Sequence, residues 1–178
     1  MQAIEELVQV VSEVGSSGGS TGPIASPAER AQGQAPTSRQ RRVLLVDDNE
    51  TDRNLLKVLL EEHAEILVVG EASNGEEAEA LAEQHRPDII LMDIHLPQVN
   101  GVEATRHINR RLPQVMIIGV SSLYTPHDYN AMITAGAVAF VRKEDAVEAL
   151  YKTIEFSTRT FYSGRRAALS HNASRRSN

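Results

Sequence analysis

The chain has 178 residues, a length that suits one well-buried domain with segments left over for tails. It contains no cysteine, which excludes disulfides and thiolate metal sites. Its wholly apolar stretches are no longer than a strand, and Glu5 and Glu6 stand where a signal peptide would be basic. We therefore expect a soluble, cytoplasmic protein with no membrane association.

The formal net charge of -6 is unevenly distributed. Residues 43–156 carry 9 basic and 20 acidic side chains, whereas the 22 residues from Ser157 carry five arginines and no acid. An acidic surface repels the phosphates of nucleic acids, so we expect no specific DNA binding by the folded part. The basic tail should give at most weak contacts that are lost as salt rises.

Three segments outside the acidic region have simple compositions. Residues 1–14 place Ile4, Leu7, Val8 and Val11 at helical spacing, which predicts either a short amphipathic helix or a tail without structure. Residues 15–41 are rich in Gly, Ser, Pro and Gln, a composition typical of flexible linkers. We expect residues 162–178, the basic tail, to lack regular structure.

From Val43 onward, apolar runs of strand length alternate with helical patterns. The expected strands are Val43–Val46, Ile66–Val69, Ile89–Asp93, Val115–Val120 and Val138–Val141. The expected helices are Glu50–His63, a segment from Ser73 that stops at Pro87, Val102–Arg110, Pro126–Gly136 and Asp145–Phe156. This alternation predicts an α/β fold with a doubly wound, five-stranded parallel sheet.

Two helix starts carry local signals. Ser73 is followed three residues later by Glu76, which predicts a capping box. Thr125 precedes Pro126, so threonine should cap that helix with proline at its first position. Gly136 should end the same helix.

Polar residues follow four of the expected strands. Asp47 and Asp48 follow the first strand, Asp93 ends the third, Ser121 follows the fourth and Lys143 follows the fifth. The carboxyl ends of parallel strands meet at one edge of a sheet, so these side chains should lie together. Clustered carboxylates need a cation, and hard oxygen ligands favour Mg²⁺. An aspartate there could form an acyl phosphate, with lysine and hydroxyl holding the phosphoryl oxygens.

Each of these residues alone also has an ordinary explanation. Asp47 or Asp48 could cap a helix, Asp93 could be a turn acid, Ser121 a loop hydroxyl and Lys143 a solvated charge. Four successive coincidences at one sheet edge make the ordinary explanations improbable together.

With these motifs, the sequence closely resembles the receiver domain of two-component response regulators, over residues 42–161. The resemblance implies the flavodoxin-like (βα)5 receiver fold. The sequences of residues 69–75 and 91–94 are most similar to those of NarL/LuxR-type receivers. The matching motifs are Val-Leu-Leu-Val-Asp47-Asp48, Pro-Asp-Ile-Ile-Leu-Met-Asp93, Leu96-Pro97 with Gly101, Gly-Val-Ser121 and Ala-Gly-Ala-Val-Ala-Phe140-Val-Arg-Lys143.

The resemblance implies a role for each acid. Asp93 accepts a phosphoryl group from a histidine kinase or phosphotransfer protein. Asp48 and Asp93 hold Mg²⁺ together with the backbone carbonyl of His95, and Asp47 acts through metal-bound water. The chain is then a self-phosphorylating and self-dephosphorylating switch, not a turnover enzyme on an external substrate.

The resemblance also implies how phosphorylation alters the output surface. Ser121 and Lys143 contact the phosphoryl group, and Phe140 changes position together with Ser121. The output surface is the face formed by the helix near 126–136, the fifth strand and the last helix. Its partner is an unknown output protein or a second copy of the chain.

Several alternatives remain beside this reading. A flavodoxin-like cofactor binder needs a phosphate loop where this chain has Asp47-Asp48-Asn49, and an aspartyl phosphatase needs its nucleophile on the first strand and a cap. A phosphorylation-independent scaffold is the more serious rival, although such proteins usually lose the acids or the lysine. NarL/LuxR-type regulators continue into a helix-turn-helix domain, for which the 17 residues after Phe161 are too few. The receiver either stands alone or was separated from a DNA-binding domain.

Overall fold

The computed structural model describes residues 39–123 and 125–174, with side chains as far as residue 163. The helix expected at residues 1–14 and the linker as far as residue 38 lie outside the described residues. Within the described part, no helix is both long and apolar enough to cross a membrane.

The described chain alternates strands and helices, as the sequence patterns predict. The strands are β1 (Arg41–Val46), β2 (Ile66–Ala72), β3 (Ile89–Asp93), β4 (Met116–Ser121) and β5 (Ala139–Arg142). The helices are α2 (Glu50–Glu61), α3 (Gly75–His85), α4 (Gly101–Arg111), α5 (Pro126–Ala135) and α6 (Ala146–Ser174), with a 3-10 turn η2 (Lys143–Asp145) before α6.

The five strands form one sheet in the order β2-β1-β3-β4-β5, and each neighbouring pair is parallel. The central strand β3 aligns Leu91 with Leu45 of β1 on one side and with Ile118 of β4 on the other. This order confirms the expected doubly wound, flavodoxin-like architecture. It also brings the carboxyl ends of β1, β3, β4 and β5 to a single edge.

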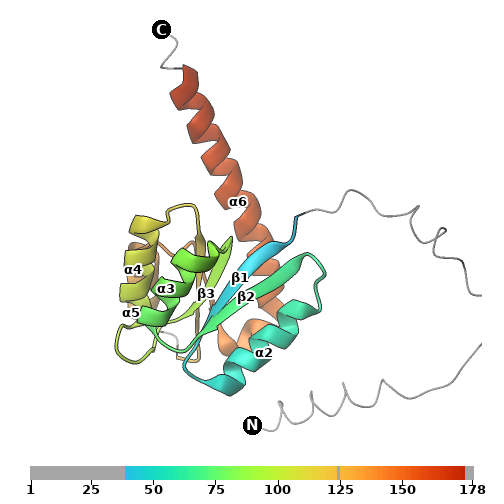
Figure 1. Cartoon of the computed structure of the whole chain (residues 1–178), viewed down its shortest axis with the longest axis vertical. Coiled ribbons are helices and arrows are strands. Elements are labelled where there is room, and N and C mark those ends of the chain that lie inside the picture. Colours follow the sequence, from blue (N-terminus) through green and yellow to red (C-terminus); the bar gives the residue numbers. More distant parts are fainter. Residues whose placement is uncertain (1–38, 124, 175–178) are drawn as a thin grey trace, which may run out of the picture. The chain divides into compact units, whose positions relative to one another are not determined.

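Helices cover both faces of the sheet (Figure 1). Successive strand residues point to opposite faces, so Leu44 and Ile90 pack in one core with α3, α4 and α5. Their neighbours Leu45 and Leu91 pack in the other core with α2 and α6. Leu44, Leu45, Ile90 and Leu91 are fully buried, which explains why the strands read as continuous apolar runs.

The helix starts show one correction to the sequence analysis. The side chain of Asn74, not Ser73, caps α3 by accepting a hydrogen bond from the Glu77 N–H at 2.9 Å. Glu77, not Glu76, turns back to accept from the Ser73 N–H at 2.8 Å. The helix therefore begins at Gly75, one residue later than the box predicts. A Cβ at Gly75 would lie 2.3 Å from the Val99 carbonyl oxygen, so this position requires glycine.

The helix α5 begins and ends where the sequence places its boundaries. The Thr125 hydroxyl accepts a hydrogen bond from the Asp128 N–H at 3.1 Å, and Pro126 is the first helical residue. Gly136 follows the helix with a φ of 118°, a left-handed conformation that favours glycine.

The last helix is much longer than the expected Asp145–Phe156. It begins at Ala146 and runs to Ser174, so most of the tail expected to lack structure is helical. Phe161 packs against the α2/α6 core, and the Tyr162 hydroxyl lies 3.4 Å from the Asp88 carbonyl oxygen. Beyond Phe156 the sequence has no proline, the residue that most strongly interrupts a helix.

Candidate functional site

The carboxyl edge of the sheet carries the polar residues that the sequence singles out. Asp47 directly follows β1, Asp93 is the last residue of β3, Ser121 is the last residue of β4 and Lys143 directly follows β5. Asp47, Asp93 and Ser121 are buried, at 0, 4 and 1% exposure. A buried carboxylate needs a charged or hydrogen-bonding partner, and here the partner is a lysine.

Lys143 lies at the centre of the acidic cluster. Its Nζ donates a hydrogen bond to Asp93 Oδ2 at 2.7 Å and another to Asp52 Oδ2 at 2.9 Å. It also forms an ion pair with Asp47 Oδ2 at 2.7 Å. Its side chain is 12% exposed, so the ammonium is largely removed from water.

The titration of this cluster follows from burial and charge together. Burial raises the pKa of the Asp47 carboxyl, and Lys143 offsets that effect only in part. Burial alone would lower the pKa of Lys143, but hydrogen bonds to Asp47, Asp93 and Asp52 outweigh burial and hold that pKa above its usual range. The lysine is therefore an ammonium ion at neutral pH.

Three carboxylates form a compact oxygen cluster. One oxygen each from Asp47, Asp48 and Asp93 lies within 4.8 Å of the others, and Asp48 is exposed to solvent. Backbone N–H groups orient two of them, because Asp47 Oδ1 accepts from Asn49 at 3.0 Å and Asp93 Oδ1 accepts from His95 at 3.1 Å. Hard oxygen donors with one side open to water suit Mg²⁺, which keeps several waters when bound. The donor set fits this ion.

Two side chains that the sequence analysis missed also reach the site. His95 was expected to contribute only its backbone carbonyl, but its imidazole Nδ1 lies 3.2 Å from Ser121 Oγ. Asp52, on the first turn of α2, reaches Lys143. Asp52 stands in the first turn of α2, where acids are common, so no signal in the sequence pointed to its contact with Lys143.

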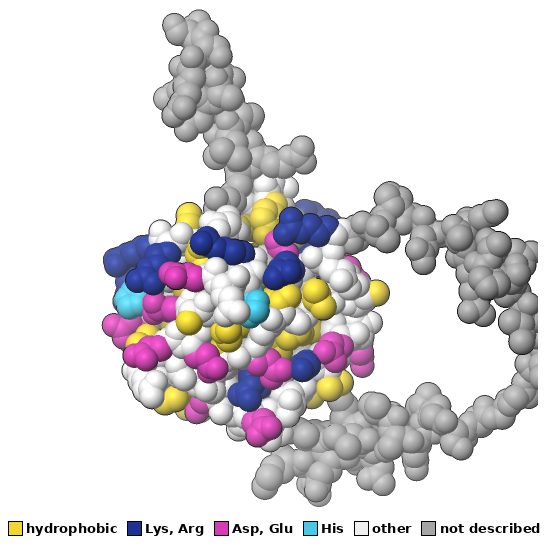
Figure 2. All heavy atoms as spheres, in the orientation of Figure 1, with side chains coloured by type: hydrophobic (Ala, Val, Ile, Leu, Met, Phe, Trp, Pro, Cys, Tyr) yellow, Lys and Arg dark blue, Asp and Glu magenta, His cyan; other side chains and the backbone are white. Residues whose placement is uncertain are grey.

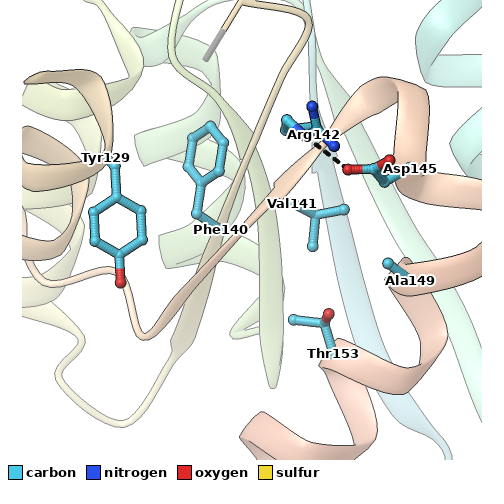
Figure 3. A pocket seen from close by; sticks show the side chains of 7 residues that line it. All are labelled: Tyr129, Phe140, Val141, Arg142, Asp145, Ala149 and Thr153. Atoms are coloured by element: carbon cyan, nitrogen blue, oxygen red, sulfur yellow. Dashed lines mark hydrogen bonds and ion pairs between the residues drawn. The ribbon is translucent and has the colours of Figure 1, made fainter. Parts of the chain in front are cut away.

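Phe140 lies on β5 beside an open groove of about 320 Å³ (Figure 3). Its ring meets the ring of Tyr129 edge to face, with centroids 6.3 Å apart. Gly119 on β4 allows Phe140 to lie close, because a Cβ there would be 2.8 Å from the phenyl ring. The groove runs between α5 and α6 and is lined by Tyr129, Phe140, Val141, Arg142, Asp145, Ala149 and Thr153.

Acidic and basic side chains lie next to one another over the face shown in Figure 2. Ion pairs join α3 to α4, with His107 Nδ1 2.8 Å from Glu79 and Arg111 3.0 Å from Glu83. Side-chain contacts between acidic and basic residues therefore link these two helices on the surface.

Comparison with known proteins identifies the family. Residues 43–155 match the model of the response regulator receiver domain. The chain belongs to this family. The receiver is 36% identical over 115 residues to the transcriptional regulatory protein DegU of Brevibacillus brevis, covering 64% of this chain and 48% of DegU. The family expected from the sequence is thereby confirmed.

Other relatives of the receiver have different outputs. It is 42% identical over 107 residues to a protein-glutamate methylesterase/protein-glutamine glutaminase of Methanospirillum hungatei, covering 59% of this chain and 31% of that protein. A LuxR-family response regulator structure from Aurantimonas matches with a TM-score of 0.63 and 33% identity, covering 65% of this chain and 83% of that one. The chain spans between 27 and 55% of the length of the first five curated relatives it matches.

Proposed function

We propose that this receiver is a phosphorylation-dependent switch in which Asp93 accepts a phosphoryl group from a histidine kinase or phosphotransfer protein. The observation that carries the proposal is the arrangement around Asp93: its Oδ2 lies 2.7 Å from the Lys143 ammonium, inside a cluster of three carboxylates. A buried aspartate beside a cation at the carboxyl edge of the sheet has the setting of a nucleophile.

In the proposed reaction, a carboxylate oxygen of Asp93 attacks the phosphorus of a phosphohistidine. The new P–O bond forms as the P–N bond breaks, and the electron pair of that bond returns to the imidazole nitrogen. The product is an acyl phosphate on Asp93 and a free histidine. The Lys143 ammonium neutralises charge on the phosphoryl oxygens during transfer.

The acids Asp47, Asp48 and Asp93 and the carbonyl of His95 would hold Mg²⁺. When bound, the ion supplies positive charge for the phosphoryl oxygens. Asp48, being exposed, leaves an open side through which a phosphodonor can approach. The buried Asp47 fixes Lys143 from the side of β1.

Ser121 and Phe140 would convert the phosphoryl group into a signal. The Ser121 hydroxyl contacts His95 at 3.2 Å, and turning toward a phosphoryl oxygen requires it to leave that contact. Movement of the β4 end then changes the packing of Phe140, which lies against Gly119 of the same strand. A new dianion thus biases a packing arrangement that extends to the α5/β5/α6 face.

We propose that this α5/β5/α6 face is the output surface, for a partner protein or a second copy of the chain. Tyr129 and Ile133 are 39 and 37% exposed, whereas Met132 is fully buried. The sequence predicts that at least half of the apolar residues Tyr129, Met132, Ile133 and Phe140 fill the core. Met132 does so, and Phe140 packs partly buried against the core. The exposed Tyr129 lines the groove in Figure 3.

A second candidate is the receiver part of a transcriptional regulator. It is supported by the similarity to DegU, of which this chain covers 48%. We also propose that this chain binds no specific DNA, acts in the cytoplasm and turns over no external substrate. The DNA-binding part of this proposal is tested on the purified protein. Tight, sequence-selective DNA binding at physiological salt in a gel-shift assay would contradict the protein-contact proposal.

The proposed switch is tested by intact mass. Purified protein is mixed with acetyl phosphate in the presence and absence of Mg²⁺. The expected result is the mass of one added phosphoryl group, labile to mild base, which forms with Mg²⁺ and not in its absence. A protein that stays unmodified in both conditions is a scaffold and not a switch.

A further inference from the structure

The ammonium of Lys143 has three N–H donors, and the structure places three carboxylates around it. Asp93 Oδ2 and Asp47 Oδ2 lie 2.7 Å from Nζ, and Asp52 Oδ2 lies 2.9 Å away. The three acids come from three elements: the end of β3, the end of β1 and the first turn of α2. Nζ donates hydrogen bonds to Asp93 and Asp52 and forms an ion pair with Asp47.

Asp52 differs from the other two acids. Its carboxylate lies outside the cluster of Asp47, Asp48 and Asp93 oxygens, and its side chain is 28% exposed. Asp52 therefore contacts the site through the lysine. The Nζ lies between Asp52 on the side of α2 and Asp93 on β3.

The backbone around Asp52 is held in place by two neighbours. The Asn49 side chain caps α2 by accepting from the N–H groups of Thr51 and Asp52, at 2.9 and 3.3 Å. The Arg53 guanidinium donates to the Asp47 carbonyl oxygen at 2.7 Å and to Glu71 at 3.2 Å. The position of Asp52 is thus fixed relative to Asp47, so its carboxylate can orient a flexible lysine.

We propose that Asp52 is a positioning residue that keeps the Lys143 ammonium over Asp93 during phosphoryl transfer. This inference rests on the proposed function. When Asp93 Oδ2 forms a bond to phosphorus, it no longer offers Lys143 a full carboxylate charge. Asp52 is chemically unchanged by the reaction, so it continues to hold Nζ at the site, where the remaining donors can reach the phosphoryl oxygens.

Two simpler roles for Asp52 predict different behaviour. An acid in the first turn of α2 stabilises the helix through its dipole, as does Glu50 in the same turn. In that case the two acids would be equivalent. Alternatively, a fourth negative charge near the site repels an anionic phosphodonor. In that case removal of Asp52 would favour phosphorylation.

The test compares four proteins: the unmodified chain, Asp52→Ala, Asp52→Asn and Glu50→Ala. The initial rate of Asp93 phosphorylation is measured at a series of acetyl phosphate concentrations with saturating Mg²⁺. Asparagine keeps a hydrogen-bond acceptor and removes the charge, whereas alanine removes both. Glu50→Ala is the matched control, because it removes the same charge from the same helical turn.

The expected result is a fall of about fivefold in the saturating rate of Asp52→Ala, the loss typical of one charge-assisted hydrogen bond, with little change in the half-saturating concentration. Asp52→Asn should recover most of that rate, and Glu50→Ala should match the unmodified chain. Asp52→Leu, similar in size and without an acceptor, repeats the test if the alanine variant does not fold.

Three outcomes overturn the inference. If the saturating phosphorylation rate of Asp52→Ala equals that of Glu50→Ala, Asp52 only stabilises α2 through the helix dipole. A lower half-saturating concentration in both Asp52→Ala and Asp52→Asn assigns it to charge repulsion. Absence of any phosphorylation of the unmodified chain rejects the proposed function, and with it this inference, whereas the first two outcomes leave the proposed function intact.

Discussion

The two ends of strand β3 carry an aspartate each, with opposite surroundings. Asp88, just before the strand, accepts a hydrogen bond from the Arg42 N–H at 2.9 Å and pairs with Arg39 on the surface. Asp93, at the other end, is buried with other acids around one lysine. The same residue type therefore joins neighbouring strands at one end and concentrates like charge at the other.

The contacts of Asp88 stabilise the fold, whereas those of Asp93 suit a reactive site. Every strong contact of Asp88 satisfies a polar group: its carboxylate binds Arg42, and its carbonyl oxygen accepts from the Met116 N–H at 3.0 Å. At the Asp93 end, three carboxylates surround a single ammonium ion, an arrangement that favours cation binding over stability. We expect substitutions at the two ends to separate folding from phosphorylation.

The largest expected effect is the loss of phosphorylation in Asp93→Asn. The amide is not a nucleophile, so no acyl phosphate can form at this position. Asp88→Asn, the matched change at the other end of β3, should be phosphorylated at the normal rate. Both variants are incubated with acetyl phosphate and Mg²⁺ and analysed by intact mass. A base-labile phosphoryl group in Asp93→Asn at the normal level would contradict the assignment.

Lys143→Ala should fold and yet lose the link between phosphorylation and output. The loss of the ammonium leaves the buried Asp47 unpaired, so the free energy of unfolding should fall by about 3 kcal/mol without Mg²⁺. Added Mg²⁺ should recover much of this loss, because it binds the folded carboxylate cluster. Urea unfolding with and without Mg²⁺ measures both effects.

Lys143→Ala also tests how phosphorylation is coupled to association. Phosphorylated Lys143→Ala should show no phosphate-dependent association, because the ammonium no longer orients the dianion. Association is followed by sedimentation or, once a partner is known, by binding to it. Normal phosphate-dependent association in this variant would show that Lys143 does not link phosphorylation to the output surface.

Asp88→Ala should affect stability alone. It removes the carboxylate that accepts from Arg42, so the free energy of unfolding should fall by about 1 kcal/mol. Phosphorylation of the variant by acetyl phosphate should be unchanged. A phosphorylation rate that falls together with stability would show that the two ends of β3 are coupled.

The smallest expected effect concerns a surface pair far from the acids of the site. The Tyr151 hydroxyl donates to the Glu65 carboxylate, which raises the pKa of Tyr151 to about 12 and lowers that of Glu65. The tyrosine contributes stability below its ordinary pKa of 10.0, and this contribution is lost as the pH rises through about 12. The glutamate contributes stability above its ordinary pKa of 4.5, and this contribution is lost as the pH falls through its lower pKa in the folded protein.

The stability difference between the unmodified chain and Tyr151→Phe should therefore be greatest between about pH 5 and pH 9 and shrink on both sides of that range. Urea unfolding over a pH series measures it. Lys143→Ala serves as the contrasting variant, since its loss should depend on Mg²⁺. A Tyr151→Phe difference that does not vary with pH would show that the hydrogen bond contributes nothing.

The architecture and the strand ends could be predicted because the signals are local. Each strand is a short apolar run between helical patterns, and four of the five runs lead directly into a residue of the candidate site. Asp93 follows four apolar residues without interruption, so its place at the sheet edge follows from the parallel topology alone. The comparisons with known receivers confirm the fold and the family.

The rest depends on contacts that sequence spacing does not fix. Asp52 has the pattern of an ordinary first-turn acid, and its proposed role follows only from the contact that Lys143 makes with it across the sheet edge. The α3 cap falls on Asn74 and not on Ser73, a choice between two adjacent capping residues that the sequence does not decide. The length of α6 was missed because a basic composition suggested a tail, although no proline interrupts the helix there.

The position of the phosphoryl group tests the central claim most directly. Protein phosphorylated with Mg²⁺ is treated with borohydride, which reduces an acyl phosphate to homoserine, and is then digested and sequenced by tandem mass spectrometry. Asp88 and Asp93 lie five residues apart with no lysine or arginine between them, so a tryptic peptide contains both. The account predicts homoserine at position 93 and unchanged aspartate at position 88. Homoserine elsewhere, with Asp93 intact, would contradict it.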